Sequence, residues 1–168
     1  MIEVLVLTGP CGVGKSTVAF ECMELLERAG VPCAMVDAEL AYFHPKPEGD
    51  PHGYTVAEAA LRALWKVYEA RGHVRLLLGR VVEDREQLAI VERAVPGANI
   101  RLLRLVARPE TIGERLRKRE VGSRLAWHVE RSAQIASSTL GEPVDAERSV
   151  ADVARDVLDR AGWLRGDG

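Results

Sequence analysis

The chain has 168 residues, of which 47% are apolar and 29% charged, and its formal net charge is −2. This length and composition predict a single soluble domain, residues 1–168, with a core of its own. The near-neutral charge gives no electrostatic basis for binding nucleic acid, and the absence of an apolar run of about 18 residues argues against a membrane span.

Apolar runs alternate with segments of helical periodicity from one end of the chain to the other. In chain order, we predict strand 2–7, helix 15–29, strand 33–36, helix 56–70, strand 74–78, helix 83–94, strand 100–106, helices 109–120 and 126–138 separated by a break at 121–124, strand 143–146 and helix 150–161. Residues 38–54 contain three prolines and two glycines, so no regular helix is expected there beyond about residue 42.

Strands that alternate with helices in this way predict an α/β fold, with a five-stranded parallel sheet covered on both faces. Right-handed crossovers place the carboxyl end of every strand at one edge of the sheet, which is where ligands bind. The residues that directly follow strands are expected to line this edge, and they are residues 9–16, Asp37, Arg80, Glu83 and Arg108.

A glycine-rich segment after the first strand matches G-x-x-x-x-G-K-[ST], the Walker A pattern, between a strand and a helix. Its glycines let backbone N–H groups point at phosphate oxygens, and the helix N-terminus adds a positive field. We predict Lys15 at the β- and γ-phosphates and Ser16 as a Mg²⁺ ligand. The predicted nucleotide contacts are Gly9, Pro10, Cys11, Gly12, Val13, Gly14, Lys15, Ser16 and Thr17.

Two carboxylates, Asp37 and Glu39, follow the second strand as D-x-E. A carboxylate there faces the γ-phosphate across the crevice, where it holds Mg²⁺ through water or accepts a proton from a substrate hydroxyl. We predict Asp37 as a catalytic and metal-binding residue, and Glu39 and Arg80 as substrate contacts. The alternative is that Asp37 caps a helical turn over residues 38–42.

Arginines gather around the predicted break between two late helices. Arg115 and Arg119 lie four residues apart on one helix face, and Arg131 follows on the next helix. Such a helix pair acts as a lid that excludes water and stabilises the charge of the transferring group. We predict a lid over residues 115–131, with Arg115 and Arg119 in nucleotide binding and catalysis and Arg131 as a substrate contact. The alternative is a solvated helix whose arginines pair with glutamates.

Two missing motifs narrow the class of nucleotide-binding protein. The third predicted strand, in the segment VRLLLGR, carries no acidic residue, and the guanine-reading motif N-K-x-D is absent. Both observations count against motor ATPases and switch GTPases.

The sequence predicts a cytoplasmic protein. Residues 1–8 lack the charged region and cleavage site of a signal peptide. The three cysteines, Cys11, Cys22 and Cys33, are odd in number and suit reduced thiols better than a disulfide framework.

Four features together resemble the small phosphate-loop kinases of the nucleoside-monophosphate-kinase-like group, which includes shikimate, gluconate and adenylylsulfate kinases and chloramphenicol phosphotransferase. They are the phosphate loop, D-x-[DE] after the second strand, an R-L-x-x-R helix and a closing V-D…S-V-x-D-V-A segment. Residues 115–120 with Trp127, His128 and Arg131 also resemble uncharacterised actinobacterial ATP-binding proteins of this size.

The resemblance implies a three-layer α/β/α phosphate-loop fold with sheet order 2-3-1-4-5, a short helical lid, and ATP as donor. It implies that Arg115 stacks on adenine, that Arg119 meets phosphate and that Asp37 contacts the acceptor, while residues 145–148 border the adenine. Glu39 stands where these kinases commonly have Asp, and the residues after it match no acceptor signature, so the acceptor stays unassigned.

Two functions remain open. The first is an ATP:small-molecule phosphotransferase with a hydroxyl acceptor, acting as a monomer or homodimer with ATP and Mg²⁺. The second is an ATP-binding regulatory or interaction protein with little or no phosphotransfer, which the missing third-strand acid and Glu39 favour.

Overall fold

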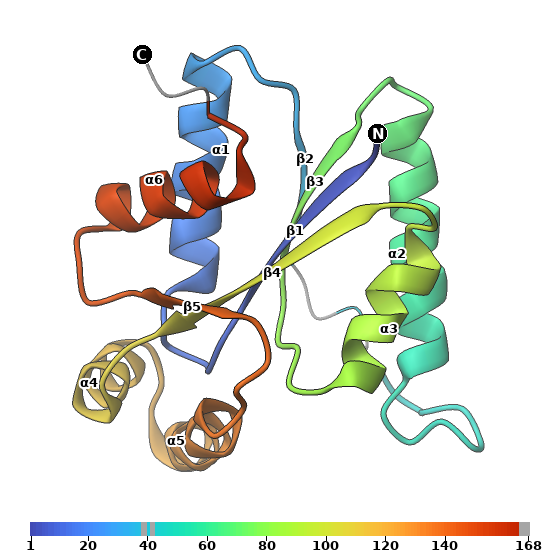
Figure 1. Cartoon of the computed structure of the whole chain (residues 1–168). Helices are drawn as coiled ribbons and strands as arrows, with labels where there is room; N and C mark the ends of the chain where they lie inside the picture. Colours follow the sequence, from blue (N-terminus) through green and yellow to red (C-terminus); the bar gives the residue numbers. More distant parts are fainter. Residues whose placement is uncertain (38–39, 41–42, 165–168) are drawn as a thin grey trace.

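The computed structural model describes residues 1–37, 40 and 43–164. Five strands form one parallel sheet in the order β2-β3-β1-β4-β5, as the resemblance implies (Figure 1). The strands are β1 (Glu3–Thr8), β2 (Ala34–Asp37), β3 (Arg75–Gly79), β4 (Asn99–Val106) and β5 (Glu142–Asp145). Within the described part of the chain, no helix is both long and apolar enough to cross a membrane.

Helices cover both faces of the sheet. They are α1 (Lys15–Arg28), α2 (Tyr54–Glu69), α3 (Arg85–Ala94), α4 (Pro109–Arg119), α5 (Gly122–Ala136) and α6 (Val150–Ala161). Figure 1 shows α1 and α6 on one face and α2 and α3 on the other, with α4 and α5 side by side below the sheet. The predicted three-layer α/β/α architecture is therefore confirmed.

The central strand β1 divides the core into two halves. Its side chains alternate across the sheet, so Leu5 and Leu7 pack toward α1 and α6, whereas Val4 and Val6 pack toward α2 and α3. All four side chains are buried. This burial on both faces explains why the segment is an unbroken apolar run.

The connection between α4 and α5 is shorter than predicted. Only Glu120 and Val121 separate the two helices, so the predicted break at 121–124 is wrong at its far end. Gly122 has a φ of 62°, which few other residues adopt readily, and it turns the chain directly into α5. As a result, Arg124, the last residue of the predicted break, lies within α5.

Hydrogen bonds join the last residue of β1 to the segment that follows β3. The hydroxyl of Thr8, which is buried, accepts a hydrogen bond from the Val82 N–H at 2.7 Å and donates one to the Val82 carbonyl at 3.1 Å. The root of the glycine-rich loop is therefore fixed to the segment between β3 and α3, which holds the edge of the candidate site in place.

Candidate active site

The glycine-rich loop joins β1 to α1 at the carboxyl edge of the sheet. Gly9 has a φ of 136°, and a Cβ at this position would lie 2.6 Å from the Leu105 carbonyl oxygen, so both backbone shape and space require glycine. The Lys15 ammonium donates to the carbonyl oxygens of Gly9 and Pro10 at 2.8 and 3.1 Å. The loop therefore folds around its own lysine, the arrangement expected of a phosphate cradle.

A pocket of about 480 Å³ opens beside this loop. The loop and the first turn of α1 form its floor, and residues from β2, β3, α4 and the loop before α6 form its walls. The predicted site residues that line it include Lys15, Ser16, Thr17, Asp37, Arg80 and Arg115. The sheet topology thus brings together residues from four separate parts of the chain.

Asp37 and Arg80 enter the pocket from neighbouring strands. Asp37 is the last residue of β2, and its register partner in β3 is Gly79. Arg80 follows directly; its backbone N–H donates to the Leu7 carbonyl at 3.1 Å and its side chain is buried. Both residues lie where a strand ends, as predicted. Glu39, the second predicted carboxylate, lies outside the described residues.

Arg115 lines the pocket from α4. Its guanidinium donates to the Val13 carbonyl at 2.8 Å and to the Ala146 carbonyl at 3.1 Å, and so joins α4 to the glycine-rich loop and to the segment after β5. The guanidinium is therefore held against the glycine-rich loop. Arg119 ends α4, and its side chain lies outside the described part of the structure.

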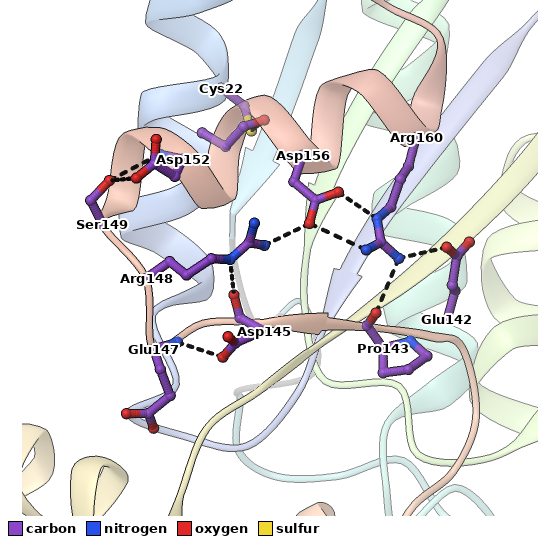
Figure 2. Close-up of polar contacts among 11 residues, drawn as sticks. Cys22, Glu142, Pro143, Asp145, Glu147, Arg148, Ser149, Asp152, Asp156 and Arg160 are labelled. Atoms are coloured by element: carbon purple, nitrogen blue, oxygen red, sulfur yellow. Dashed lines mark hydrogen bonds and ion pairs between the residues drawn. The ribbon is translucent and has the colours of Figure 1, made fainter.

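Arg148 lines the pocket and ends the segment 145–148, for which the resemblance implies a place beside the adenine, but no role of its own was predicted for it. Figure 2 shows its guanidinium extended toward Asp156, with distances of 2.6 Å to that carboxylate and 3.2 Å to the Asp145 carbonyl. Arg160 donates to the other Asp156 oxygen at 2.6 Å. The Arg160 and Arg148 hydrogen bonds lower the pKa of the Asp156 carboxyl. The i,i+4 spacing of Asp156 and Arg160 predicts their ion pair, but nothing in the sequence predicts the ion pair between Asp156 and Arg148.

Three hydrogen-bonded contacts anchor α5 to the rest of the site. Arg131 forms a two-pronged ion pair with Glu83, one prong of which measures 2.9 Å. Ser132 donates to the Cys11 carbonyl at 2.9 Å, and Ser138, which follows the end of α5, donates to the Glu83 carbonyl at 2.8 Å. The hydrogen bond to Glu83 raises the pKa of Arg131. The α5 side of the predicted lid is thus fastened to the glycine-rich loop and to the segment after β3.

Two residues predicted at the edge of the sheet are engaged elsewhere. Glu83 binds Arg131, and Arg108 forms an exposed ion pair with Glu147 at 3.1 Å. Neither Glu83 nor Arg108 lines the pocket, and Arg131 does not line it either. A position directly after a strand was therefore not sufficient to place a side chain in the site.

The pocket offers oxygen donors that fit Mg²⁺. The Ser16 hydroxyl and the Asp37 carboxylate line the same pocket, and both are hard ligands of the kind that this cation prefers. Across the described residues, no group of three or more His, Cys, Asp and Glu side chains forms a metal cluster. The donor set suits a cation that also takes ligands from phosphate and water, as Mg²⁺ commonly does.

No family model matches the chain, and no curated protein is detectably similar to it in sequence. Solved structures match nearly all of it. A sugar kinase from Janibacter sp. HTCC2649 is 16% identical with a TM-score of 0.64, over 98% of this chain and 96% of that one. The tunicamycin resistance protein of Deinococcus radiodurans is 18% identical with a TM-score of 0.62, over 98% of each chain. The APS kinase of Mycobacterium tuberculosis, solved with AMPPNP and APS, is 17% identical with a TM-score of 0.58, over 94% and 96%.

Because these identities are 16–18%, the matches show the fold alone, which is a three-layer α/β/α fold with a five-stranded parallel sheet. The predicted fold class is confirmed. The resemblance to actinobacterial ATP-binding proteins of this size stays a prediction.

Proposed function

We propose that the protein is an ATP-dependent phosphotransferase that moves the γ-phosphate of ATP to a hydroxyl group of a small molecule. The observation that carries this proposal is the meeting of a phosphate cradle, a strand-end carboxylate and a fixed guanidinium in one pocket. Similarity in fold to a sugar kinase and an APS kinase supports it.

Lys15 and Arg115 would stabilise the transferring group. Phosphoryl transfer depends on positioning and electrostatic stabilisation, because charge spreads over the oxygens of the phosphoryl in flight. Lys15 lies at the start of α1 within the cradle, and Arg115 is already held by two carbonyl oxygens, one of them in the glycine-rich loop. Arg119, one turn further along α4, is proposed to join them on the phosphates.

Asp37 would serve the acceptor. It ends β2 and lines the same pocket as Lys15 and Arg115, and we propose that a hydroxyl nucleophile approaches the γ-phosphate there. Its carboxylate would orient that hydroxyl and take its proton. Ser16 and Asp37 are the residues that would hold Mg²⁺, which, when bound, neutralises charge on the phosphate oxygens. Arg80, Arg131 and Glu39 are proposed as further acceptor contacts.

The nucleobase is proposed to lie near the segment between β5 and α6. Arg115 binds the carbonyl of Ala146 in this segment, and Ala146, Arg148 and Val150 line the same pocket. A guanidinium above an aromatic ring gains cation–π attraction, so Arg115 would stack on adenine. Residues 145–148 would then border the ring.

The Lys15→Ala variant tests the proposal. We expect it to lose ATP turnover in the presence of Mg²⁺ and a mixed pool of sugars, polyols and hydroxylated antibiotics, because the cradle loses its cation. Lys66→Ala, which removes an exposed lysine of α2, is the matched control and keeps the wild-type rate. Full turnover in the Lys15 variant would contradict the proposal.

A second candidate is an ATP-binding regulatory or interaction protein with little or no phosphotransfer. The sequence RLLLG of β3 favours it, since this strand carries no acid of the kind that ATPases use for Mg²⁺. It differs from the first candidate in one measurable way: ATP would bind, and no member of a broad acceptor pool would be phosphorylated.

A further inference from the structure

The ends of β2 and β3 are fitted together at one point in the pocket. Asp37 and Gly79 are register partners in this parallel strand pair, and both line the pocket. A Cβ built on Gly79 would lie 2.6 Å from Asp37 Oδ1 and 3.3 Å from its Cγ. Real Cβ atoms essentially never approach so closely, so the Asp37 carboxylate occupies the space that any other residue at 79 would fill.

The backbone does not explain this glycine. Gly79 does not have a positive φ, and it pairs in regular register with Asp37 of β2. Glycine weakens a strand because it costs conformational entropy and offers no side chain to pack. The remaining physical reason for glycine here is the close approach of the carboxylate.

We propose that Gly79 is a positioning residue for Asp37: its missing side chain lets an acid carried by β2 lay its carboxylate over the end of β3. Strand β3, with the sequence RLLLG, carries no acid of its own, and β2 thereby supplies a carboxylate at the end of β3. The expected effect on kcat rests on the proposed function. The positioning of the carboxylate rests only on the contact between Gly79 and Asp37.

Replacing Gly79 with alanine is expected to move the carboxylate and leave the fold intact. The nearest atom is the end of a side chain that can rotate, so the carboxylate gives way before the strand does. A misplacement of about 1 Å in a catalytic group costs about 10²-fold in rate. We therefore expect kcat to fall about 10²-fold, with the KM for ATP little changed.

The experiment is a double-mutant cycle of wild type, Gly79→Ala, Asp37→Ala and the double variant. If Gly79 acts through Asp37, Gly79→Ala lowers kcat only when Asp37 is present, and the double variant matches Asp37→Ala. Equal losses in both backgrounds, or no loss with Asp37 present, would overturn the inference. Gly113→Ala is the control for adding a methyl group, because a Cβ there lies at least 3.5 Å from its nearest neighbour, the Arg117 side chain.

A second readout separates this inference from the proposed function. The NMR resonance of the Asp37 carboxyl carbon, assigned with Asp37→Ala, is compared between folded wild type and folded Gly79→Ala. We expect the resonance to move, whether or not a phosphate acceptor is found. If wild type shows no transfer, the proposed function fails, and an unmoved resonance then overturns the positioning role of Gly79 separately.

Discussion

At the scale of single residues, Asp37 is the side chain that best distinguishes the two candidate functions. In the proposed function, the glycine-rich loop binds only the nucleotide, and Arg115, which lines the same pocket, acts on the nucleotide as well. Asp37 is the pocket residue from β2, and the proposal gives it the acceptor hydroxyl. Its substitution therefore separates a transferase from a nucleotide binder.

We expect Asp37→Asn to lower kcat by about 10²–10⁴-fold, the usual contribution of a positioned general base. The amide keeps the size of the carboxylate and cannot take a proton. ATP affinity, measured by calorimetry, is expected to stay nearly unchanged. A large loss of ATP affinity would instead limit Asp37 to a structural or metal-binding role and contradict the role proposed for it on the acceptor.

At the scale of elements, the ion pair that attaches α5 to the segment after β3 is expected to limit the motion of the predicted lid. Glu83→Gln removes one charge of the ion pair with Arg131, in which the two side chains are 19% and 32% exposed. We expect faster amide hydrogen exchange across α5, with global stability changed by less than about 1 kcal/mol.

Glu24→Gln is the control for that measurement. It breaks an exposed ion pair with Arg28 within α1, which is far from α5 in sequence and covers a face of the sheet, whereas α5 lies below the sheet (Figure 1). Exchange in α5 should match wild type in this variant. Unchanged exchange in Glu83→Gln would show that the ion pair does not hold the helix.

The arginines that hold Asp156 make the contact between β5 and α6 sensitive to acid. The pKa of Asp156 is lowered in the folded protein, first by Arg160 and then by Arg148. A lowered carboxyl pKa stabilises the fold above the unfolded-state pKa, and this stability is lost as pH falls through the folded-state value. We expect Asp156→Asn to cost about 1 kcal/mol at neutral pH and to flatten the fall in stability below about pH 4.

Urea unfolding between neutral and acid pH measures this effect. Asp159→Asn is the control, because Asp159 is an exposed acid on the same helix and its removal changes the net charge equally. The control should keep the wild-type pH dependence. An Asp156 variant as acid-sensitive as wild type would contradict the role given to this carboxylate. Since Arg148 lines the pocket, looser nucleotide binding is a further expected consequence.

At the scale of the whole molecule, local patterns predicted the elements well. The phosphate loop was readable because its glycines, lysine and serine are consecutive. Strand and helix positions followed from periodicity, with bounds that differ by a few residues, and the error at 121–124 arose because Gly122 turns the chain within a single residue. The strand order came from resemblance, since nothing in the sequence itself orders the strands.

Contacts between distant segments could not be predicted. The pairs Arg115–Val13 and Arg131–Glu83 join residues 102 and 48 positions apart. Their formation depends on which strand ends meet at the sheet edge. The close contact between the Asp37 carboxylate and Gly79 could not be predicted either. The sequence around a strand glycine does not reveal which side chain lies beside it. Arg131 was predicted as a substrate contact because it follows the arginine cluster of the predicted lid, and the sequence does not reveal its ion pair with Glu83.

The most direct test of the account follows the γ-phosphate itself. ATP labelled on its γ-phosphate is incubated with the protein, Mg²⁺ and a panel of small hydroxyl compounds, and the products are separated. The account predicts that the label appears in a phosphate ester of one acceptor, at a rate well above its release as inorganic phosphate. Label that stays in ATP, or that appears as inorganic phosphate alone with every acceptor, would contradict it.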